Sequence, residues 1–560
     1  MTELPPCTAT PHGLATTGHP KETESPIEVP ISQTHPTIRL TMMDAFRKRE
    51  RAEDMGQEEQ PSSLRTPVSP PRKSRRLEVA HWKSPWQLTR IRDLPEHVNR
   101  DAVSLKDILG DPLITECWEF NYLHDISFLM DAFDPDTRHL VDVHVVHGFW
   151  KQEDLNRATI SVEAARHGNV KLHVAPMPEM FGTHHSKMII LFRNDETAQV
   201  IIHTANMIAK DWTNMTNAVW RSPRLPKMDD ETEKAALPKD YADLRIGGGE
   251  RFKADLVNYL RSYDRRKVTC GPLADKISHH DFSAVNAALI ASVPGKHPTN
   301  DLSKTAFGWA AIQRCLQTVR CKPSVSEIVI QVSSIATLGA NDTWLQKTLF
   351  ESLKTCKDEP AQRPVFKIIF PTADEIRESL DGYSSGGSIH TKIQSPQQVQ
   401  QLRYLRPMLH HWANDSRNGI SLPPKSRMKN GGRNRAAPHI KTYIRYNNVN
   451  SIDWALLTSA NLSKQAWGGE SVKSTGETRI ASWEIGVLLW PALFGSNASM
   501  VGTFQSDFPG GDDSANETGA DLIGLRIAYS LPLQRYSQEE IPWVASNNHP
   551  EPDCFGQKWM

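Results

Sequence analysis

Two histidine–lysine pairs in this chain have the spacing needed to build a site for a phosphate group. His185 stands two positions before Lys187, and His439 stands two positions before Lys441. Side chains at positions i and i+2 of a strand point to the same face, so each pair would present an imidazole beside an ammonium group. Two such pairs could stabilise developing charge on one phosphodiester without a metal ion. The spacing therefore predicts a metal-independent phosphodiesterase.

The sequence that follows each pair has the same order in both places. A strand-like stretch begins at the lysine, a second one ends in Ala-Asn, and a tryptophan follows the asparagine by six positions. The asparagines, Asn206 and Asn461, come 19 and 20 positions after the two lysines, and the tryptophans are Trp212 and Trp467. This internal repeat predicts two half-sites, one in each of two domains, that face one shared anion.

Two further His-x-Lys triplets, which begin at His81 and His390, lack this context. The first runs into Pro85, and proline does not continue a central strand. The second precedes the polar stretch 394–401, and neither triplet is followed by an apolar strand and an Ala-Asn. A single triplet is most simply a surface pair, whereas two matched half-sites are not explained in that way.

The composition limits the class of protein. The 560 residues carry 65 Lys and Arg against 65 Asp and Glu, so the formal net charge is zero. Coating of duplex DNA by charge alone is therefore not expected, although a local basic groove remains open. The seven cysteines are scattered and form no Cys-x-x-Cys, which predicts free thiols and no zinc site. No apolar leader and no run of about 18 apolar residues occur, which predicts a soluble intracellular protein.

The chain is expected to begin with a disordered tail and to continue as two α/β domains. The tail, residues 1–80, is rich in Pro, Thr, Ser, Glu and Arg. The domains are expected over residues 81–296 and 297–560. The tail contains a basic run, residues 70–76, of a kind found in nuclear import signals, in phosphate contacts and in solvated linkers.

Apolar runs predict the strands of each domain. The expected strands cover residues 140–146, 170–174, 188–192, 200–203 and 289–294, and then 328–332, 366–370, 454–458 and 485–490. Phe252, Leu256 and Leu260 recur every four residues and predict a helix with one apolar face. Two polar stretches, residues 222–240 and 508–520, are expected to be surface loops.

The paired half-sites resemble those of the phospholipase D superfamily. Its usual members carry an Asp a few residues past the Lys, and residues 188–192 and 442–446 contain none. The Asn-bearing variant resembles the tyrosyl-DNA phosphodiesterase family, through residues 181–187, 438–443 and 458–464. The resemblance extends from about Ser84 to Trp559. It implies an α/β fold of two similar phospholipase D-like domains, each a mixed sheet between helices, related by a pseudo-two-fold axis.

The resemblance also implies a reaction and roles for the repeated residues. The family releases topoisomerase I-derived peptides from DNA 3′ ends. His185 would attack phosphorus and form a phosphohistidine, while His439 would protonate the departing tyrosine oxygen and later activate the water that frees a 3′ phosphate. The phosphate oxygens would be held by four side chains: Lys187, Lys441, Asn206 and Asn461. No cofactor and no metal are expected.

Two further residues match the partners that fix the histidine tautomers in the family. Glu484 would orient His185 from the second domain. The partner of the second histidine is commonly Gln, and this chain has Asn217 at that position. Because Asn is one methylene shorter, either the backbone lies closer to His439 or the contact is weaker.

Several positions resemble DNA contacts. Phe181 matches a residue that stacks on a nucleobase, an interaction worth about 1–3 kcal/mol, with a core Phe as the alternative. Ser333, Ser334 and Ser463 resemble contacts to backbone phosphates, with Ser459 beside them. Five cations before His439 could form a basic lip for single-stranded DNA or a solvated loop: Lys425, Arg427, Lys429, Arg433 and Arg435. Trp559 resembles a residue near the substrate, with ordinary packing equally open.

The expected partners are DNA 3′ ends, single-stranded or in a frayed duplex, that carry a tyrosyl peptide or another 3′ adduct. A nuclear monomer without membrane attachment is expected. One alternative is a related hydrolase that acts on phospholipid or as a nuclease, and the other is an inactive scaffold. The missing Asp residues count against the lipid enzyme, and two intact sets of His, Lys and Asn count against the scaffold.

Overall fold

The computed structural model describes most of the chain after the expected tail. Described are residues 80–560, apart from residues 230–239, 266, 359–361, 415–427, 448–450 and 511–519. The basic run 70–76 lies outside the described residues, as do Lys425, Arg427 and large parts of the two expected surface loops. Among the helices in these described ranges, none is long and apolar enough to cross a membrane.

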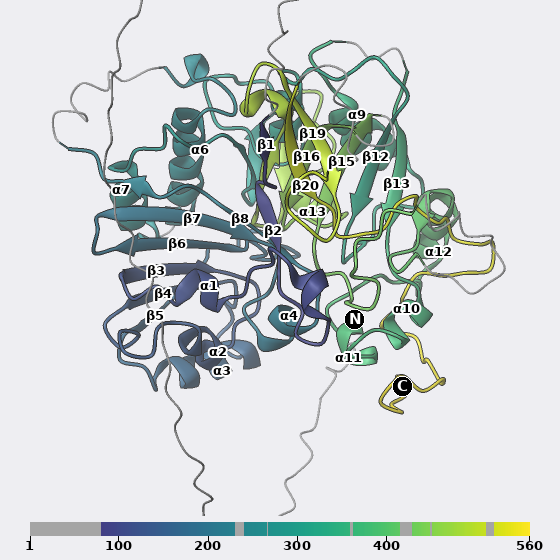
Figure 1. Ribbon diagram of the computed structural model, residues 1–560, viewed down its shortest axis with the longest axis horizontal. Coiled ribbons are helices and arrows are strands. Elements are labelled where there is room, and N and C mark those ends of the chain that lie inside the picture. Colours follow the sequence, from purple (N-terminus) through teal and green to yellow (C-terminus); the bar gives the residue numbers. More distant parts are fainter. Residues whose placement is uncertain are drawn as a thin grey trace, which may run out of the picture. The chain divides into compact units, whose positions relative to one another are not determined.

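The first sheet has eight strands in the order β2-β8-β7-β6-β3-β4-β5, with β9 paired to β7 (Figure 1). Its strands are β2 (Trp86–Leu88), β3 (Ile114–Phe120), β4 (Asp142–His147), β5 (Val170–Val174), β6 (Met188–Arg193), β7 (Thr197–His203), β8 (Ala218–Arg221) and β9 (Leu225–Pro226). Strands β3, β4 and β5 are parallel, whereas β3, β6, β7 and β8 pair antiparallel in turn. The sheet is therefore mixed, as expected.

The second sheet has ten strands in the order β1-β20-β19-β16-β15-β12-β13-β14, and β18 joins β16 to β10. Its strands are β1 (His81–Trp82), β10 (Ala288–Ser292), β12 (Ser326–Gln331), β13 (Val365–Ile369), β14 (Leu409–His410), β15 (Thr442–Asn447), β16 (Ser451–Thr458), β18 (Glu484–Leu489), β19 (Ala498–Thr503) and β20 (Asp521–Arg526). Strands β11 (Gly295–Pro298) and β17 (Glu477–Ile480) form a separate antiparallel pair.

The two sheets repeat one topology. The order β7-β6-β3-β4-β5 in the first corresponds to β16-β15-β12-β13-β14 in the second. The directions also agree, because β12, β13 and β14 are parallel while β12, β15 and β16 pair antiparallel. Strand β8 pairs with β7, and β18 pairs with β16, at matching places. The sequence repeat is thus a repeat of the fold.

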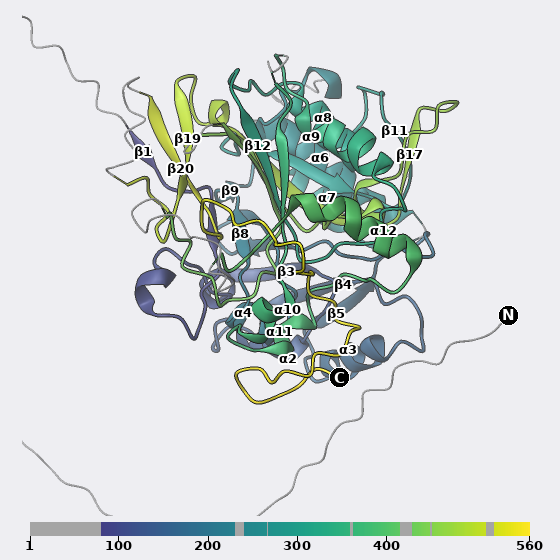
Figure 2. The ribbon, with the colours of Figure 1, turned by 90° about the vertical axis from the view of Figure 1, so that its right-hand side faces the viewer.

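Helices cover the sheets and connect their strands. The α-helices are α1 (Lys106–Leu109), α2 (Ile126–Asp131), α3 (Leu155–Ala164), α4 (Ala209–Thr213), α6 (Gly249–Arg261), α7 (Gly271–Ser278), α8 (Trp309–Leu316), α9 (Glu351–Lys354), α10 (Ala373–Arg377), α11 (Tyr383–Gly386), α12 (Pro396–Leu405) and α13 (Lys464–Trp467). Short 3-10 turns are η1 (Glu96–Asn99), η2 (Tyr241–Asp243), η3 (Ser262–Asp264), η5 (Arg406–Met408) and η7 (Pro491–Leu493), and a π-helical stretch, η4, spans Leu345–Phe350. Figure 2 shows α8 and α9 beside each other.

The first sheet is buried on both faces. In β6 the side chains alternate: Met188 and Ile190 enter one apolar cluster, while Ile189 and Leu191 enter another. The second cluster joins the sheet to α1, α2 and α3. The first cluster is larger and continues through α6, α7 and α8 into the second sheet. This two-sided burial explains why residues 188–192 of β6 are all apolar rather than alternating.

The expected helix is confirmed, since α6 buries Phe252, Leu256 and Leu260. All nine expected strands are present within a few residues of the predicted ranges. The proposed domain ranges stay a prediction. The division of the strands between the two sheets does not follow these ranges. Strands β1 and β10, which both fall within residues 81–296, pair with strands of the second sheet.

Strand β18 passes β16 without room for a side chain at Gly486. A Cβ there would lie 2.6 Å from both Leu457 O and Thr458 Cβ. We therefore expect Gly486→Ala to lower the free energy of unfolding by about 1–3 kcal/mol, measured by urea or thermal denaturation. Gly469→Ala is the control, because a Cβ at Gly469 meets nothing within 4 Å. Equal stability of the two variants would contradict this packing.

Candidate active site

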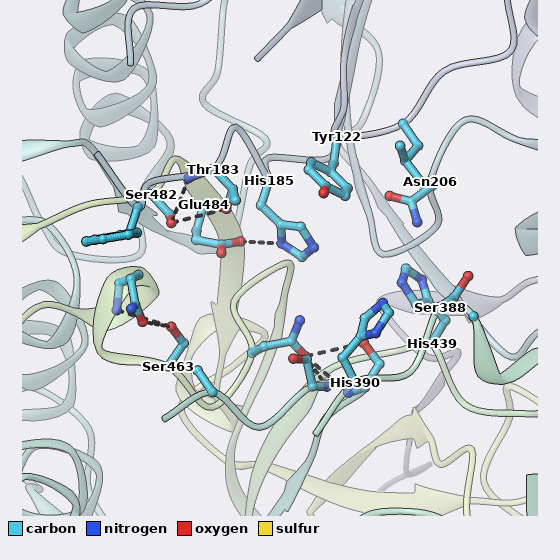
Figure 3. A pocket seen from close by; sticks show the side chains of 18 residues that line it. Tyr122, Thr183, His185, Asn206, Ser388, His390, His439, Ser463, Ser482 and Glu484 are labelled. Carbon is cyan, nitrogen blue, oxygen red and sulfur yellow. Dashed lines mark hydrogen bonds and ion pairs between the residues drawn. The ribbon is translucent and has the colours of Figure 1, made fainter. Parts of the chain in front are cut away.

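The two half-sites line one cavity of about 300 Å³. His185, Asn206 and Glu484 lie on its wall with His439 and Asn461. Figure 3 shows the rings of His185 and His439 reaching into the same space from different segments of the chain. The structure thus brings together residues that are more than 250 positions apart, as the repeat predicted.

Each His-x-Lys segment leads directly into a strand. Lys187 precedes Met188, the first residue of β6, and Lys441 precedes Thr442, the first residue of β15. Both lysines are fully buried. Lys187 Nζ donates to the backbone oxygen of its own histidine at 3.2 Å, and Lys441 Nζ makes the matching contact. Each ammonium group is therefore held next to its histidine by a hydrogen bond to the histidine backbone.

The backbone of each histidine is anchored to the opposite half. His185 N donates to Trp483 O at 3.0 Å, next to Glu484 at the start of β18. In the matching contact, His439 N donates to Thr216 O at 3.0 Å, next to Asn217 before β8. Each half therefore fixes the position of the other half's histidine.

The equal spacing from Asn to Trp in the two halves of the repeat has a structural cause. Trp212 Nε1 donates to Asn206 O at 3.1 Å, and Trp467 Nε1 donates to Asn461 O at 3.1 Å. A buried indole six positions later thus fixes each asparagine at the end of its strand. In the second half, Asn461 Oδ1 also accepts from two backbone N–H groups, at 3.1 and 2.9 Å, of the Ser333–Ser334 segment. Its Nδ2 is left for an acceptor in the cavity.

The side-chain partners of the histidines also cross between the halves. His185 Nδ1 lies 2.9 Å from Glu484 Oε2, which also accepts from Ser459 Oγ at 2.5 Å. His439 Nδ1 lies 3.3 Å from Asn217 Oδ1, which also accepts from Thr204 Oγ1 at 2.8 Å. The shorter Asn217 side chain thus reaches the ring, although the contact is longer than that of Glu484.

Asp211 is a neighbour of His439 that sequence reasoning missed. Its Oδ2 lies 3.1 Å from His439 Nδ1, and the side chain is fully buried. Asp211 belongs to α4 and comes five positions after Asn206, where the second half has Ala466 five positions after Asn461. An acidic residue in only one of two otherwise matched segments was the signal available in the sequence.

Burial and the ammonium groups control protonation at His185. Burial lowers the pKa of His185 to about 4; Lys187 and Lys441 add to this shift, and Glu484 opposes it. Burial also lowers the pKa of Lys187 to about 8. Burial alone would raise the pKa of Glu484, but His185 and neighbouring donors hold it below its ordinary value. A neutral imidazole hydrogen-bonded to a carboxylate is suited to act as a nucleophile.

The pKa values of the histidine and the lysine in the second half-site are also lowered. Burial, followed by Lys441 and Lys187, places the pKa of His439 far below its ordinary value. Burial and Lys187 do the same for the pKa of Lys441. A phosphodiester anion at this place would raise both values, because an opposite charge nearby favours the protonated forms. The proton on His439 is thus coupled to the presence of an anion.

The predicted DNA contacts lie at the cavity, but the hydroxyl groups of Ser333 and Ser463 have protein partners. Phe181 is 78% exposed at the cavity, so it is not a core residue. Ser333 Oγ donates to Asn461 Oδ1 at 3.3 Å. Ser463 Oγ caps α13 and contacts Gln465 Oε1 at 2.8 Å. Ser334, which also lines the cavity, contributes its backbone N–H to Asn461.

Two aromatic rings of the cavity wall were not predicted. The Tyr122 ring lies 5.7 Å from the His185 ring, centroid to centroid. His390, whose His-x-Lys triplet was expected to be a surface pair, lies on the cavity wall in the segment after α11 (Figure 3). It is no third half-site, because helix α12 and not a strand follows it directly, but its side chain lines the cavity. No pattern around Tyr122 distinguished it in the sequence, and the His-x-Lys triplet at His390 lacked the strand and the Ala-Asn of the two half-sites.

Two arginines of the expected basic lip, Arg433 and Arg435, are held by contacts within the protein. Arg433 is fully buried and donates to Thr89 O and Val98 O, so its role is to hold the fold. Arg435 forms an ion pair with Glu378 at 3.4 Å. Trp559 packs with its ring 5.5 Å from that of Trp543 and does not line the cavity.

Chemically, the cavity is lined by two imidazoles and two amides, and the buried ammonium groups of Lys187 and Lys441 lie close enough to act on His185. Among the residues that the structure describes, no three His, Cys, Asp or Glu side chains are grouped as metal ligands. The six described cysteines are free thiols. The arrangement can therefore bind an anion, form a bond from nitrogen to phosphorus and transfer a proton.

The low pKa of His185 has a measurable consequence. Because its pKa is about 4 and lies below the ordinary value of about 6.5, the ring should stay neutral on titration from pH 8 to about pH 5. Nitrogen NMR of ring-labelled histidine would follow this directly, with His185→Gln assigning the signal. A midpoint above about pH 6 would show that burial does not control this group.

Comparison with known proteins agrees with the fold and the site. A family model described as Tyrosyl-DNA phosphodiesterase matches residues 85–537. A probable tyrosyl-DNA phosphodiesterase of Schizosaccharomyces pombe is 31% identical, over 85% of this chain and 95% of the relative. Tyrosyl-DNA phosphodiesterase 1 of Arabidopsis thaliana is 30% identical, over 85% of this chain and 76% of the relative. The crystal structure of the yeast tyrosyl-DNA phosphodiesterase covers 82% of this chain and 99% of its own, with a TM-score of 0.58 and 22% identity, and confirms the fold. The chain therefore belongs to the tyrosyl-DNA phosphodiesterase family, which confirms the predicted class of phosphodiesterase.

Proposed function

We propose that this protein hydrolyses the phosphodiester bond between a DNA 3′ end and a tyrosine of a topoisomerase I-derived peptide. The observation that carries the proposal is the crossed arrangement of the site. His185 and His439 enter one cavity, and each contacts side chains of the opposite half through Nδ1. The Nε2 atom of each ring is therefore the nitrogen available for the reaction.

In the first step, His185 Nε2 attacks phosphorus. The bond from phosphorus to the tyrosine oxygen breaks, and His439 Nε2 gives its proton to that oxygen. The assignment of His185 as nucleophile rests on its neighbours. Glu484 places a carboxylate 2.9 Å from its Nδ1, which supports the positive charge that the ring acquires, and Phe181 lines the same cavity four positions before His185 in the chain. The product is a phosphohistidine that joins the enzyme to the DNA.

In the second step, water attacks phosphorus and gives a proton to His439. The bond between phosphorus and His185 Nε2 breaks, and the DNA leaves with a 3′ phosphate. Through both steps the charge on the phosphate oxygens is balanced by Lys187 and Lys441, while Asn206 and Asn461 donate from their amides. These groups are fixed before the substrate arrives, so little reorganisation is needed.

The exposed Phe181 ring supports a substrate with an unpaired nucleobase. Stacking on such a ring does not depend on base identity, which suits the processing of any 3′ end. Single-stranded DNA and frayed duplex ends would present that base, and other small 3′ adducts would fit the same reaction. A monomer is sufficient, because both half-sites come from one chain. A lipid substrate and an inactive scaffold are the competing functions, and the following experiment separates them.

The central prediction concerns a single strand that carries a 3′-phosphotyrosine. We expect release of tyrosine and of DNA with a 3′ phosphate, at an undiminished rate in EDTA, because nitrogen and ammonium groups carry the reaction. Gel electrophoresis of the labelled strand would show both products. No cleavage would support the scaffold, and hydrolysis of phosphatidylcholine vesicles in place of DNA would support the lipid enzyme.

Variants of the two histidines should fail at different steps. His185→Ala should abolish turnover and form no adduct, because it lacks the nucleophile. His439→Ala should complete the first step poorly and hydrolyse the adduct about 10²–10⁴-fold more slowly, so that DNA remains joined to the protein. A denaturing gel reads both outcomes. Adduct formation by His185→Ala would reverse the proposed roles.

We further propose that the protein acts in the nucleus. The support is the DNA substrate together with the basic run at residues 70–76. Replacing its four cations by alanine, at Arg72, Lys73, Arg75 and Arg76, should reduce nuclear accumulation of a fluorescent fusion of the full chain. Fluorescence microscopy would measure the nuclear share. An unchanged distribution would show that this run is not the import signal.

A further inference from the structure

The partners of the two histidines occupy equivalent places in the repeated fold. Glu484 is the first residue of β18, and Asn217 comes directly before Ala218, the first residue of β8. Each accepts a hydrogen bond from a hydroxyl group at the end of the neighbouring strand, of Ser459 and of Thr204 respectively. The two half-sites thus match in position, but one supplies a carboxylate and the other a neutral amide.

Asp211 places a carboxylate where the repeat has no counterpart. The equivalent position in α13 is Ala466, which has no functional group. Asp211 Oδ2 lies 3.1 Å from His439 Nδ1, closer than the 3.3 Å from Asn217 Oδ1 to the same atom. The first half therefore presents two groups to one ring nitrogen, and one of them can carry charge.

Asp211 also contacts the phosphate-binding side of the site. The same Oδ2 atom accepts from Asn206 N at 2.8 Å, so it lies between His439 and the asparagine of the first half. Asn217 Nδ2 donates to Asp211 O at 2.8 Å, which ties the amide to the backbone of α4. Ser388 Oγ lies 3.5 Å from Oδ1 on the other side. The carboxylate is thus held in place by backbone and side-chain contacts from several segments.

We propose that Asp211 is the positioning residue that supplies the negative charge behind His439, as Glu484 does behind His185. This inference rests on the proposed function, because it concerns the proton carried by His439. A carboxylate stabilises the imidazolium form that donates to the tyrosine oxygen and that forms again when water is activated. An amide orients the ring but adds no charge, so Asn217 alone would leave that form without a counter-ion.

The surroundings explain why a second acidic group is needed here. The charged and titratable groups that act on His439 are largely cationic or neutral: Lys441, Lys187, His185 and Lys210. Each of them disfavours a further positive charge on the ring. Burial raises the pKa of Asp211, and Asn206 N, Lys441, Lys210 and Lys187 counter this effect. Asp211 and His439 can therefore exchange one proton as the phosphate group binds and changes charge.

The test compares leaving groups that differ in their need for an acid. Single-turnover rates would be measured on a strand with a 3′-phosphotyrosine and on the same strand with a 3′-(4-nitrophenyl) phosphate, whose nitrophenolate departs without a proton. We expect Asp211→Asn to slow tyrosine release by about 10- to 100-fold, which is less than the roughly 10²–10⁴-fold that general acid catalysis contributes, because His439 itself remains. The nitrophenyl substrate should lose less than about threefold, because that step needs no proton from His439.

The pH profile gives a second readout. Removing a negative charge beside His439 lowers its pKa in the complex, so the alkaline limb of tyrosine release should move to lower pH in Asp211→Asn. Asp211→Glu, which keeps the charge, should restore part of the rate. Asp507→Asn serves as the matched control, because Asp507 is buried beside Arg526 outside the cavity. It should leave both substrates unaffected.

The outcomes are distinct. Equal losses on both substrates, or no shift of the alkaline limb, would show that Asp211 only supports the fold. Wild-type rates in Asp211→Asn would assign the orientation of His439 to Asn217 alone. Should the wild-type protein itself release no tyrosine, the proposed function fails rather than this inference.

Discussion

The site depends on backbone hydrogen bonds that cross between the two halves of the chain. His185 is held by the strand that begins with Glu484, and His439 is held by the segment before β8. The geometry of the two imidazoles is therefore a property of the interface and not of either sheet alone. The interface is packed as tightly as a core: the Trp483 ring stacks on the Tyr263 ring at 3.8 Å, directly behind the first half-site. The two halves share one apolar cluster. Because such a core is closely packed, a small displacement in either half would be transmitted to the reacting groups.

That interface also concentrates positive charge. Lys187 and Lys441 are fully buried, and an ammonium group without a counter-ion is expensive in a protein interior. Three acidic side chains oppose the effect of burial on the pKa of Lys187 and favour its charged form: Glu484, Asp211 and Glu119. A phosphodiester supplies a further anion at the point where the cations converge, so binding and charge relief coincide. The fixed ammonium and amide groups thus select an anionic substrate before any base or peptide is recognised.

Much of this site could be predicted from the sequence, because its main parts obey local rules. The two His-x-Lys pairs, the Asn residues and the Trp anchors recur at nearly fixed spacing, and continuous apolar runs identified strands such as β6 and β7. Other features depend on long-range contacts that no local pattern specifies. Strand β10 lies within the range expected for the first domain but pairs with β18 of the second sheet, and local hydrophobicity does not specify which strand a given strand pairs with. The residues around Arg433 in the sequence have the composition of a surface loop, but the side chain is buried and donates to backbone carbonyl groups. His390 reaches the cavity only because of how the segment after α11 is folded.

The difference between Glu484 and Asn217 has a consequence for how such an enzyme can be built. In a homodimer with two identical halves, an isologous interface would force the same substitution on both sides of the cavity. The position that Glu484 and Asn217 occupy would then carry two carboxylates or two amides, and the protein itself would not distinguish the two rings. Joining the halves in one polypeptide removes that restriction, since each copy can change alone. In a fused pair, the difference between the two imidazoles can therefore be built into the protein and does not depend on the direction in which the substrate binds.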